Sequence, residues 1–223
     1  MENFADLYSD YLISSSSYAT STGMANLLSI KHDKITRELS NGDYDSKFLW
    51  KQSKVYVKEL TQSKELITLS FDDSIEEKRY TDESELHCWH FDHTFGKSVR
   101  GVNFLTALIE VGTMRLPCAV EFVKKDLWKK DPKTGKEKRK SSVSKNELFR
   151  KMLRECNGKF RFDYVLADSW YSSNENMNCC KKELNNDFIM ALKSNRKVAL
   201  SLENKQNKEY ISIETLQLGQ QTV

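Results

Sequence analysis

Long apolar runs are absent from this sequence of 223 residues. No segment approaches the roughly 20 apolar residues that a helix needs to cross a bilayer. The opening Met1-Glu2-Asn3 is acidic, and the apolar core of a secretory signal peptide does not follow it. These absences predict a cytoplasmic protein that has no membrane partner.

Cysteine is also scarce. The five cysteines are odd in number and scattered, mostly in apolar surroundings, which favours reduced thiols over a disulfide framework. Cys88, His90 and His93 raise the question of zinc, but their spacing is not that of a closed structural site, and no fourth ligand stands out. We therefore favour a partly buried aromatic loop in which the histidines form hydrogen bonds.

A strong net charge is lacking, because 35 basic and 32 acidic residues leave a formal charge of only +3. The distribution is more informative, since residues 124–145 contain ten Lys or Arg against three acidic residues. Asp131-Pro132-Lys133-Thr134-Gly135 is a turn signal, so this segment predicts an exposed loop or β-arm. Such a segment is most often a solvated basic loop. In a DNA enzyme it would contact phosphates without reading sequence, and the residues proposed for that role are Lys129, Lys130, Lys136, Lys138, Arg139 and Lys140.

Residues 1–62 show helical spacing and almost no alternating pattern, so we predict a small all-helical N-terminal domain. Two short helices, about 22–28 and 31–39, are separated by little more than Ser29-Ile30. Lys31, Lys34 and Arg37 lie on the polar side of the second, which suggests a helix-turn-helix that binds DNA. An ordinary helical bundle with a solvated basic face explains the same pattern, and the sequence leaves both open.

Carboxylates follow two short apolar strands. Leu66-Ile67-Thr68-Leu69 contains no Pro or Gly and precedes Asp72 and Asp73, and Tyr164-Val165-Leu166-Ala167 is stopped by Asp168. Acidic residues at the carboxyl tips of neighbouring strands supply the hard oxygen ligands that Mg²⁺ or Mn²⁺ prefers. Carboxylates at strand ends also cap turns commonly. Because two such ends are predicted to be adjacent, we favour the metal interpretation.

The element order supports that adjacency for residues 63–223. After the first strand come a hairpin around Gly112-Thr113, a helix that Ser144 and Glu147 cap, the strand before Asp168, a helix over about 174–184, and a strand over 188–192. An antiparallel start followed by βαβ crossovers is the ribonuclease H-like arrangement. We therefore predict an α/β fold with a mixed sheet, flanking helices, and its first and fourth predicted strands side by side.

Four stretches together resemble bacterial insertion-sequence transposases of the cut-and-paste DDE group, which have a ribonuclease H-like core. They are residues 70–74 with Glu77-Lys78, then 88–93, 165–172 and 188–193. The resemblance runs from about Phe4 to the end of the chain.

The resemblance implies Asp72 as the first catalytic carboxylate, since the family pattern of Asp, any residue, then Thr or Ser is met by Asp72 and Ser74. It implies Asp168 as the second. The third, a Glu on a helix after the last strand, has no convincing match, because Glu203, Glu209 and Glu214 lie in polar or strand-like surroundings. The chain ends at Gln221-Thr222-Val223 where relatives continue, so we expect a truncated transposase. Asp73, Ser74 and Lys78 are expected to support the catalytic pair.

The implied function is phosphoryl transfer that cuts and joins DNA with Mg²⁺ or Mn²⁺. The implied partner is double-stranded DNA, both the terminal inverted repeats of the element and the target DNA. A second copy of the chain would join it in a homodimer on the DNA. The implied location is the bacterial cytoplasm, at the nucleoid when DNA is bound. Two alternatives stay open, a catalytically inactive remnant that binds DNA or full-length transposase, and a ribonuclease H-like nuclease. Trp170 and Tyr171 could stack on an unpaired base, or pack against the following helix.

Overall fold

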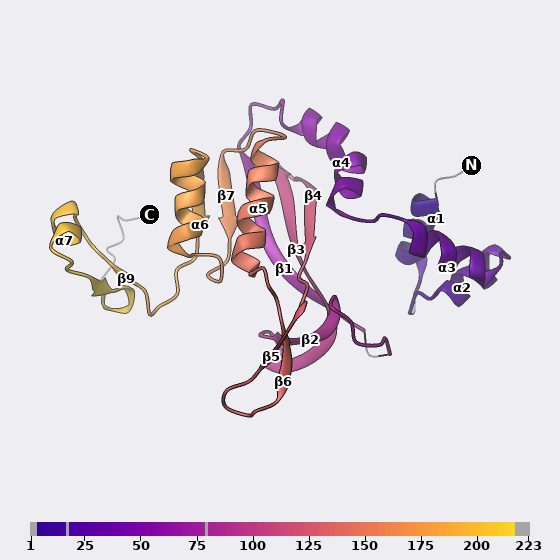
Figure 1. The fold of residues 1–223 in the computed structure, drawn as a ribbon. Helices are drawn as coiled ribbons and strands as arrows, with labels where there is room; N and C mark the ends of the chain where they lie inside the picture. Colours follow the sequence, from indigo (N-terminus) through magenta and orange to yellow (C-terminus); the bar gives the residue numbers. More distant parts are fainter. Residues whose placement is uncertain (1–3, 17, 79, 217–223) are drawn as a thin grey trace. The chain divides into compact units, whose positions relative to one another are not determined.

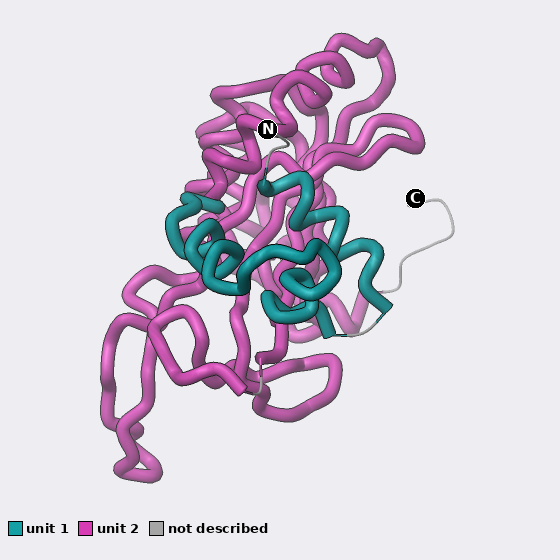
Figure 2. The backbone as a smooth tube through the Cα atoms, turned by 90° about the vertical axis from the view of Figure 1, so that its right-hand side faces the viewer, with its two compact units in different colours: residues 1–44 teal, residues 45–223 magenta. Residues whose placement is uncertain are grey.

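The computed structural model describes residues 4–16, 18–78 and 80–216. Met1-Glu2-Asn3 and Gln221-Thr222-Val223, at the two ends of the chain, lie outside these residues. The chain divides into two compact units, residues 1–44 and 45–223 (Figure 2). None of the helices in the described ranges is long and apolar enough to cross a membrane.

The first unit contains helices α1 (Phe4–Ser14), α2 (Ser21–Leu28) and α3 (His32–Asn41). Its small core consists of Tyr11, Met24, Ala25 and Ile35. The Thr20 side chain caps α2, and Ser29 ends that helix in the left-handed region at φ 53°. The two predicted helices are therefore confirmed to within a few residues. Lys31 precedes α3 and Lys34 and Arg37 lie on it, all exposed, so a DNA-binding role for this helix stays a prediction.

The second unit begins with helix α4 (Ser46–Leu60). The sequence-based boundary at residue 62 differs from this division, because α4 packs with the sheet. Val57 belongs to the same buried core as the strands, and the Val120 amide donates a hydrogen bond to Ser46 Oγ at 3.3 Å. The amphipathic pattern of α4 indicates a buried face, but it does not say which unit covers that face.

The main sheet is mixed, as predicted, with strand order β2-β3-β1-β7-β8 and β4 paired to β3. The β1–β7 and β7–β8 pairs are parallel, and the others are antiparallel. The expectation that the first and fourth predicted strands are neighbours is thus confirmed. The strands are β1 (Ile67–Glu77), β2 (His87–Asp92), β3 (Lys97–Val111), β4 (Met114–Phe122), β7 (Tyr164–Ala167) and β8 (Asp187–Met190).

Two details of this sheet differ from the sequence prediction. Strand β1 does not stop at Asp72 but continues to Glu77, because β3 pairs with it up to Gly101. A Cβ atom at Gly101 would lie 2.2 Å from the Glu76 carbonyl oxygen, so glycine permits the close approach of the two strands. The aromatic segment around Cys88, expected as a loop, contains the edge strand β2.

Helices pack against the sheet (Figure 1), and apolar side chains of the helices and strands form one buried core. Helix α5 (Lys145–Asn157) buries Leu148, Phe149, Met152, Leu153 and Cys156, which recur at helical spacing along the sequence. Helix α6 (Asn174–Asn178) continues into a π-helical turn over Cys179–Glu183. These helices share one core with β1, β3 and β7.

Two smaller features complete the chain. Strands β5 (Leu127–Lys130) and β6 (Glu137–Lys140) pair as an antiparallel hairpin, so the predicted basic loop or arm is an arm (Figure 1). After β8, the chain forms β9 (Lys197–Val198), α7 (Leu202–Gln206), β10 (Ile211–Ser212) and a 3₁₀ turn over Ile213–Thr215.

The start of α5 offers a direct test of its capping box. Ser144 Oγ accepts a hydrogen bond from the Glu147 amide at 3.2 Å, and the Ser144 amide donates to Glu147 Oε2 at 2.7 Å. Replacing Ser144 with Ala should lower the free energy of unfolding by about 1 kcal/mol, measured by urea denaturation. Ser194→Ala, at an exposed position after β8, is the control and should change little. An equal decrease in the free energy of unfolding in both variants would contradict a stabilising role for the Ser144 cap.

Candidate active site beside the end of β7

The register of β1 and β7 brings Asp72 and Asp168 together. The two strands run parallel, with Ser70 opposite Leu166 and Phe71 opposite Ala167. Side chains alternate between the faces of a sheet, so the next step of the register sets Asp72 opposite Asp168 on one face. Both carboxylates line the same cavity, of about 690 Å³.

The electrostatics of this pair suit a cation. Burial raises the pKa of Asp72 above its ordinary value, and the negative charges of Asp73 and Asp168 add to that effect. The Asp73 amide, which donates to Asp72 Oδ1 at 2.9 Å, and the charge of Lys145 act in the opposite direction. Asp168 Oδ1 accepts a hydrogen bond from the Trp170 amide at 2.9 Å. The two carboxylates therefore repel each other, and a bound cation would relieve that repulsion.

Asp73 has a different environment, because it shares its side of β1 with the buried Phe71. It forms an ion pair with Lys145 and accepts hydrogen bonds from the Tyr171 hydroxyl at 2.9 Å and from Asn103 Nδ2 at 3.5 Å. These contacts tie β1 to β3, to the first turn of α5 and to the segment after β7. Asp73 is thus held in place by three donors.

Sequence reasoning did not connect Lys145, Asn103 or Tyr171 with Asp73. Tyr171 is fully buried and stacks on Phe149 with ring centroids 5.3 Å apart. Burial, followed by the charge of Asp73, raises the pKa of the Tyr171 hydroxyl, which therefore stays a donor. Of the two expectations for Tyr171, the structure shows packing, but against Phe149 of the preceding helix α5 rather than against the following helix. The capping box could have placed Lys145 at the start of a helix, but nothing in the sequence pairs it with Asp73.

Two aromatic and two basic side chains line the cavity beside Asp168. The Trp170 ring lies 4.8 Å from Lys193 Nζ, 5.9 Å from Lys145 Nζ, and 5.6 Å from the His93 ring centroid. All four side chains line the same cavity as the two carboxylates. The cavity therefore presents paired carboxylates next to positive charge, which would suit a negatively charged substrate together with a divalent cation.

The other predicted residues are placed as follows. Ser74 lines the cavity, whereas Lys78 pairs with Glu76 at 3.4 Å and is not among its lining residues. Cys88 and His90 are buried and in contact, with Sγ 3.4 Å from Nε2. His93 instead lines the cavity of Asp72 and Asp168. Burial, with the charges of Lys125 and Lys145, lowers the pKa of His90 to about 4.

The third carboxylate stays unassigned. Glu203 lies on the short helix α7, Glu209 accepts a hydrogen bond from Asn204 at 2.7 Å, and Glu214 lies on the last 3₁₀ turn. None of them lines the cavity of Asp72 and Asp168. Within the part of the chain that the structure describes, no group of three or more His, Cys, Asp or Glu side chains is arranged to hold a metal ion.

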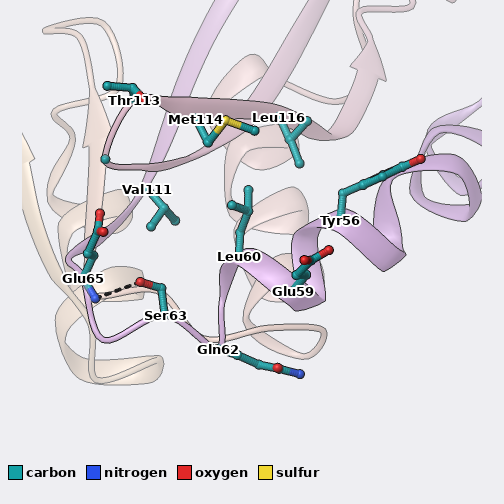
Figure 3. A pocket seen from close by; sticks show the side chains of 11 residues that line it. Tyr56, Glu59, Leu60, Gln62, Ser63, Glu65, Val111, Thr113, Met114 and Leu116 are labelled. Carbon is teal, nitrogen blue, oxygen red and sulfur yellow. Dashed lines mark hydrogen bonds between the residues drawn. The ribbon is translucent and has the colours of Figure 1, made fainter.

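A second cavity, of about 780 Å³, lies between the end of α4, the start of β1 and the β3–β4 turn (Figure 3). Its acidic residues are Glu59 and Glu65, which Figure 3 shows on different sides of the space. The Glu65 amide donates to Ser63 Oγ at 3.1 Å. Because this cavity lacks paired carboxylates, it is the weaker candidate for a catalytic centre.

Residues 2–209 match the family described as DDE superfamily endonuclease. The chain is similar at 12% identity and a TM-score of 0.33 to the Drosophila P element transposase strand transfer complex, covering 85% of this chain and 41% of that one. It is similar at 10% identity and a TM-score of 0.27 to the Mos1 strand transfer complex, covering 85% and 58%. It is similar at 11% identity and a TM-score of 0.27 to a Mos1 transposase paired-end complex with the left transposon end, covering 83% of this chain and 57% of that one. The chain thus spans about half the length of these structures, and no curated protein matches it.

Proposed function

This chain belongs to the DDE superfamily endonuclease family, and from that membership we propose that it is a DNA transposase chain that cuts and joins insertion-sequence ends. The observation that carries the proposal is the pair Asp72 and Asp168, which share one face and one cavity at the parallel β1–β7 pair. Cutting and joining are both phosphoryl transfers, in which water or a 3′-hydroxyl attacks phosphorus in line.

Endonucleases of this superfamily generally use divalent metal ions, and the residues present fit such an ion. Asp72 and Asp168 are hard oxygen donors whose mutual repulsion a cation would offset. They would hold Mg²⁺ or Mn²⁺, which when bound supplies Lewis acidity for the transfer of the phosphoryl group. The donor set is incomplete without a third carboxylate, so metal affinity and activity of this chain alone should be weak.

The chain's own residues position and neutralise the substrate. The contacts of Asp73 with Lys145 and Tyr171 fix the strand that carries Asp72 relative to the segment that carries Asp168. Lys193 and Lys145 add positive charge for the phosphates of the reacting strand. The basic β5–β6 arm would bind the DNA backbone without sequence choice.

Further features of the proposal follow from the resemblance to insertion-sequence transposases. The DNA partners would be terminal inverted repeats and target DNA, with Lys31, Lys34 and Arg37 of α3 contacting one of them. A homodimer would assemble on the DNA, and the protein would lie in the bacterial cytoplasm, at the nucleoid. The alternative of an inactive DNA-binding remnant is favoured by one observation, that no group of three or more His, Cys, Asp or Glu side chains among the described residues is arranged to hold a metal ion.

Strand transfer from pre-cut DNA ends into a plasmid, in the presence of Mn²⁺, tests the proposal. We expect joined products. Cleavage without joining would indicate a nuclease of the same fold. Metal-independent DNA binding with neither product would indicate the inactive remnant.

A further inference from the structure

Strand β2 carries two exposed aromatic residues on one face. Trp89 and Phe91 are 55% and 53% exposed, while the alternating Cys88 and His90 are buried. Because β2 is an edge strand and residues two apart share a face, both rings point the same way. Large rings that gather on an exposed edge mark an interaction surface more often than isolated ones do.

The basic arm adds a third aromatic residue to this surface. Trp128 on β5 is 57% exposed and lines one cavity, of about 490 Å³, together with Trp89 and Phe91. The arm is fixed beside β2, because Arg139 pairs with Glu83 at 3.1 Å and the Lys125 amide donates to the Glu85 carbonyl at 2.8 Å. We call the cavity lined by Trp89, Phe91 and Trp128 the aromatic groove.

The aromatic groove continues into the active site. Phe91 lines both the groove and the cavity that holds Asp72 and Asp168. Its ring lies 4.9 Å from the His93 ring, which in turn lies 5.6 Å from Trp170, two residues after Asp168. Aromatic rings therefore form a series from Trp170 through His93 to Phe91, and Phe91 lines the groove together with Trp128 of the arm.

Positive charge accompanies the rings. The groove is lined by three basic side chains, Lys125, Lys138 and Arg139, and by two acidic ones, Glu83 and Glu137. The Arg139 guanidinium lies 4.5 Å from the centre of the Trp128 ring. The rest of the arm, outside the groove, carries Lys129, Lys130, Lys133, Lys136 and Lys140. A groove that contains both aromatic rings and cations is complementary to a strand that carries both bases and phosphates.

We propose that the aromatic groove binds an unpaired segment of DNA next to the cleavage site and stacks its bases on Trp89, Phe91 and Trp128. Single-stranded DNA fits better than duplex, because base pairing and stacking hide the faces of the bases inside a double helix. The proposal rests on the proposed function, since it takes DNA as the substrate, but it assigns a separate surface and needs no catalysis.

Binding without divalent metal tests the groove independently of cleavage. Fluorescence anisotropy would compare a labelled oligothymidylate of about 12 nucleotides, an abasic oligonucleotide of equal length and a duplex, in EDTA. We expect the oligothymidylate to bind at least roughly a hundredfold more tightly than the abasic strand, because both carry the same phosphates but only one carries bases that stack on the three rings. Equal affinity for the two strands, or preference for the duplex, would overturn the proposal.

Variants then locate the effect. Trp89→Ala and Trp128→Ala should each weaken oligothymidylate binding roughly tenfold and leave abasic binding unchanged. Tyr56→Ala, at an exposed aromatic position on α4, is the matched control and should bind both strands like the wild type. A loss of affinity in the control as large as in the groove variants would count against the proposal. Because no metal is present, the result stands whether or not the chain cuts DNA.

Discussion

Replacing Asp168 with Asn should abolish Mn²⁺-dependent DNA cleavage and leave DNA affinity nearly unchanged. The substitution keeps the size of the side chain and an oxygen that can accept the Trp170 amide, but it removes the negative charge that faces Asp72. An amide oxygen is a much poorer ligand for a divalent metal than a carboxylate. Plasmid nicking and anisotropy with the same DNA measure the two quantities.

The matched control is Asp187→Asn, which removes an exposed carboxylate at the start of β8 that pairs with Lys181. This variant should cut DNA as the wild type does. If Asp168→Asn lost binding and cleavage to the same extent, Asp168 would act on DNA or on folding rather than through a metal. If it kept full cleavage, the carboxylate would not be a ligand at all.

Phe149→Ala should lower the free energy of unfolding by about 3–5 kcal/mol, which is a large part of the stability of an ordinary domain. Phe149 is fully buried on α5, and its ring lies 4.6 Å from the Phe71 ring and 5.3 Å from the Tyr171 ring. It therefore joins the helix to the strand before Asp72 and to the segment after Asp168. Urea denaturation followed by circular dichroism measures the change.

Phe95→Ala provides the comparison, because Phe95 is 73% exposed in the turn between β2 and β3. Its removal should change the free energy of unfolding by less than about 0.5 kcal/mol. A loss of less than about 1 kcal/mol in Phe149→Ala would contradict the claim that this ring holds the two carboxylate-bearing segments together.

Local patterns account for the parts of the fold that the sequence predicts well. The capping box and the period of α5 identify both its start and its buried face, because both signals lie within one helix. The βαβ order predicts the β1–β7 pair, since such crossovers bring parallel strands together. Because that pair is predictable, the sequence alone is enough to single out Asp72 and Asp168.

The remaining features depend on contacts between distant residues. Residues 72–77 are mostly polar and read as the end of a strand, yet β1 continues because Gly101 of β3 allows close pairing. The ion pair of Asp73 with Lys145 joins residues 72 positions apart, which no local pattern encodes. The aromatic groove likewise forms only because the arm folds back beside β2.

Titration of Mn²⁺ by isothermal calorimetry, on this chain and on Asp72→Asn, tests the central claim that Asp72 and Asp168 together form a divalent-cation site. The measurement needs no DNA, so it does not depend on knowing the recognised ends. We expect saturable binding by the wild type that the variant loses. Equal binding by both proteins, or no binding by either, would contradict the claim and leave the two aspartates with a structural role.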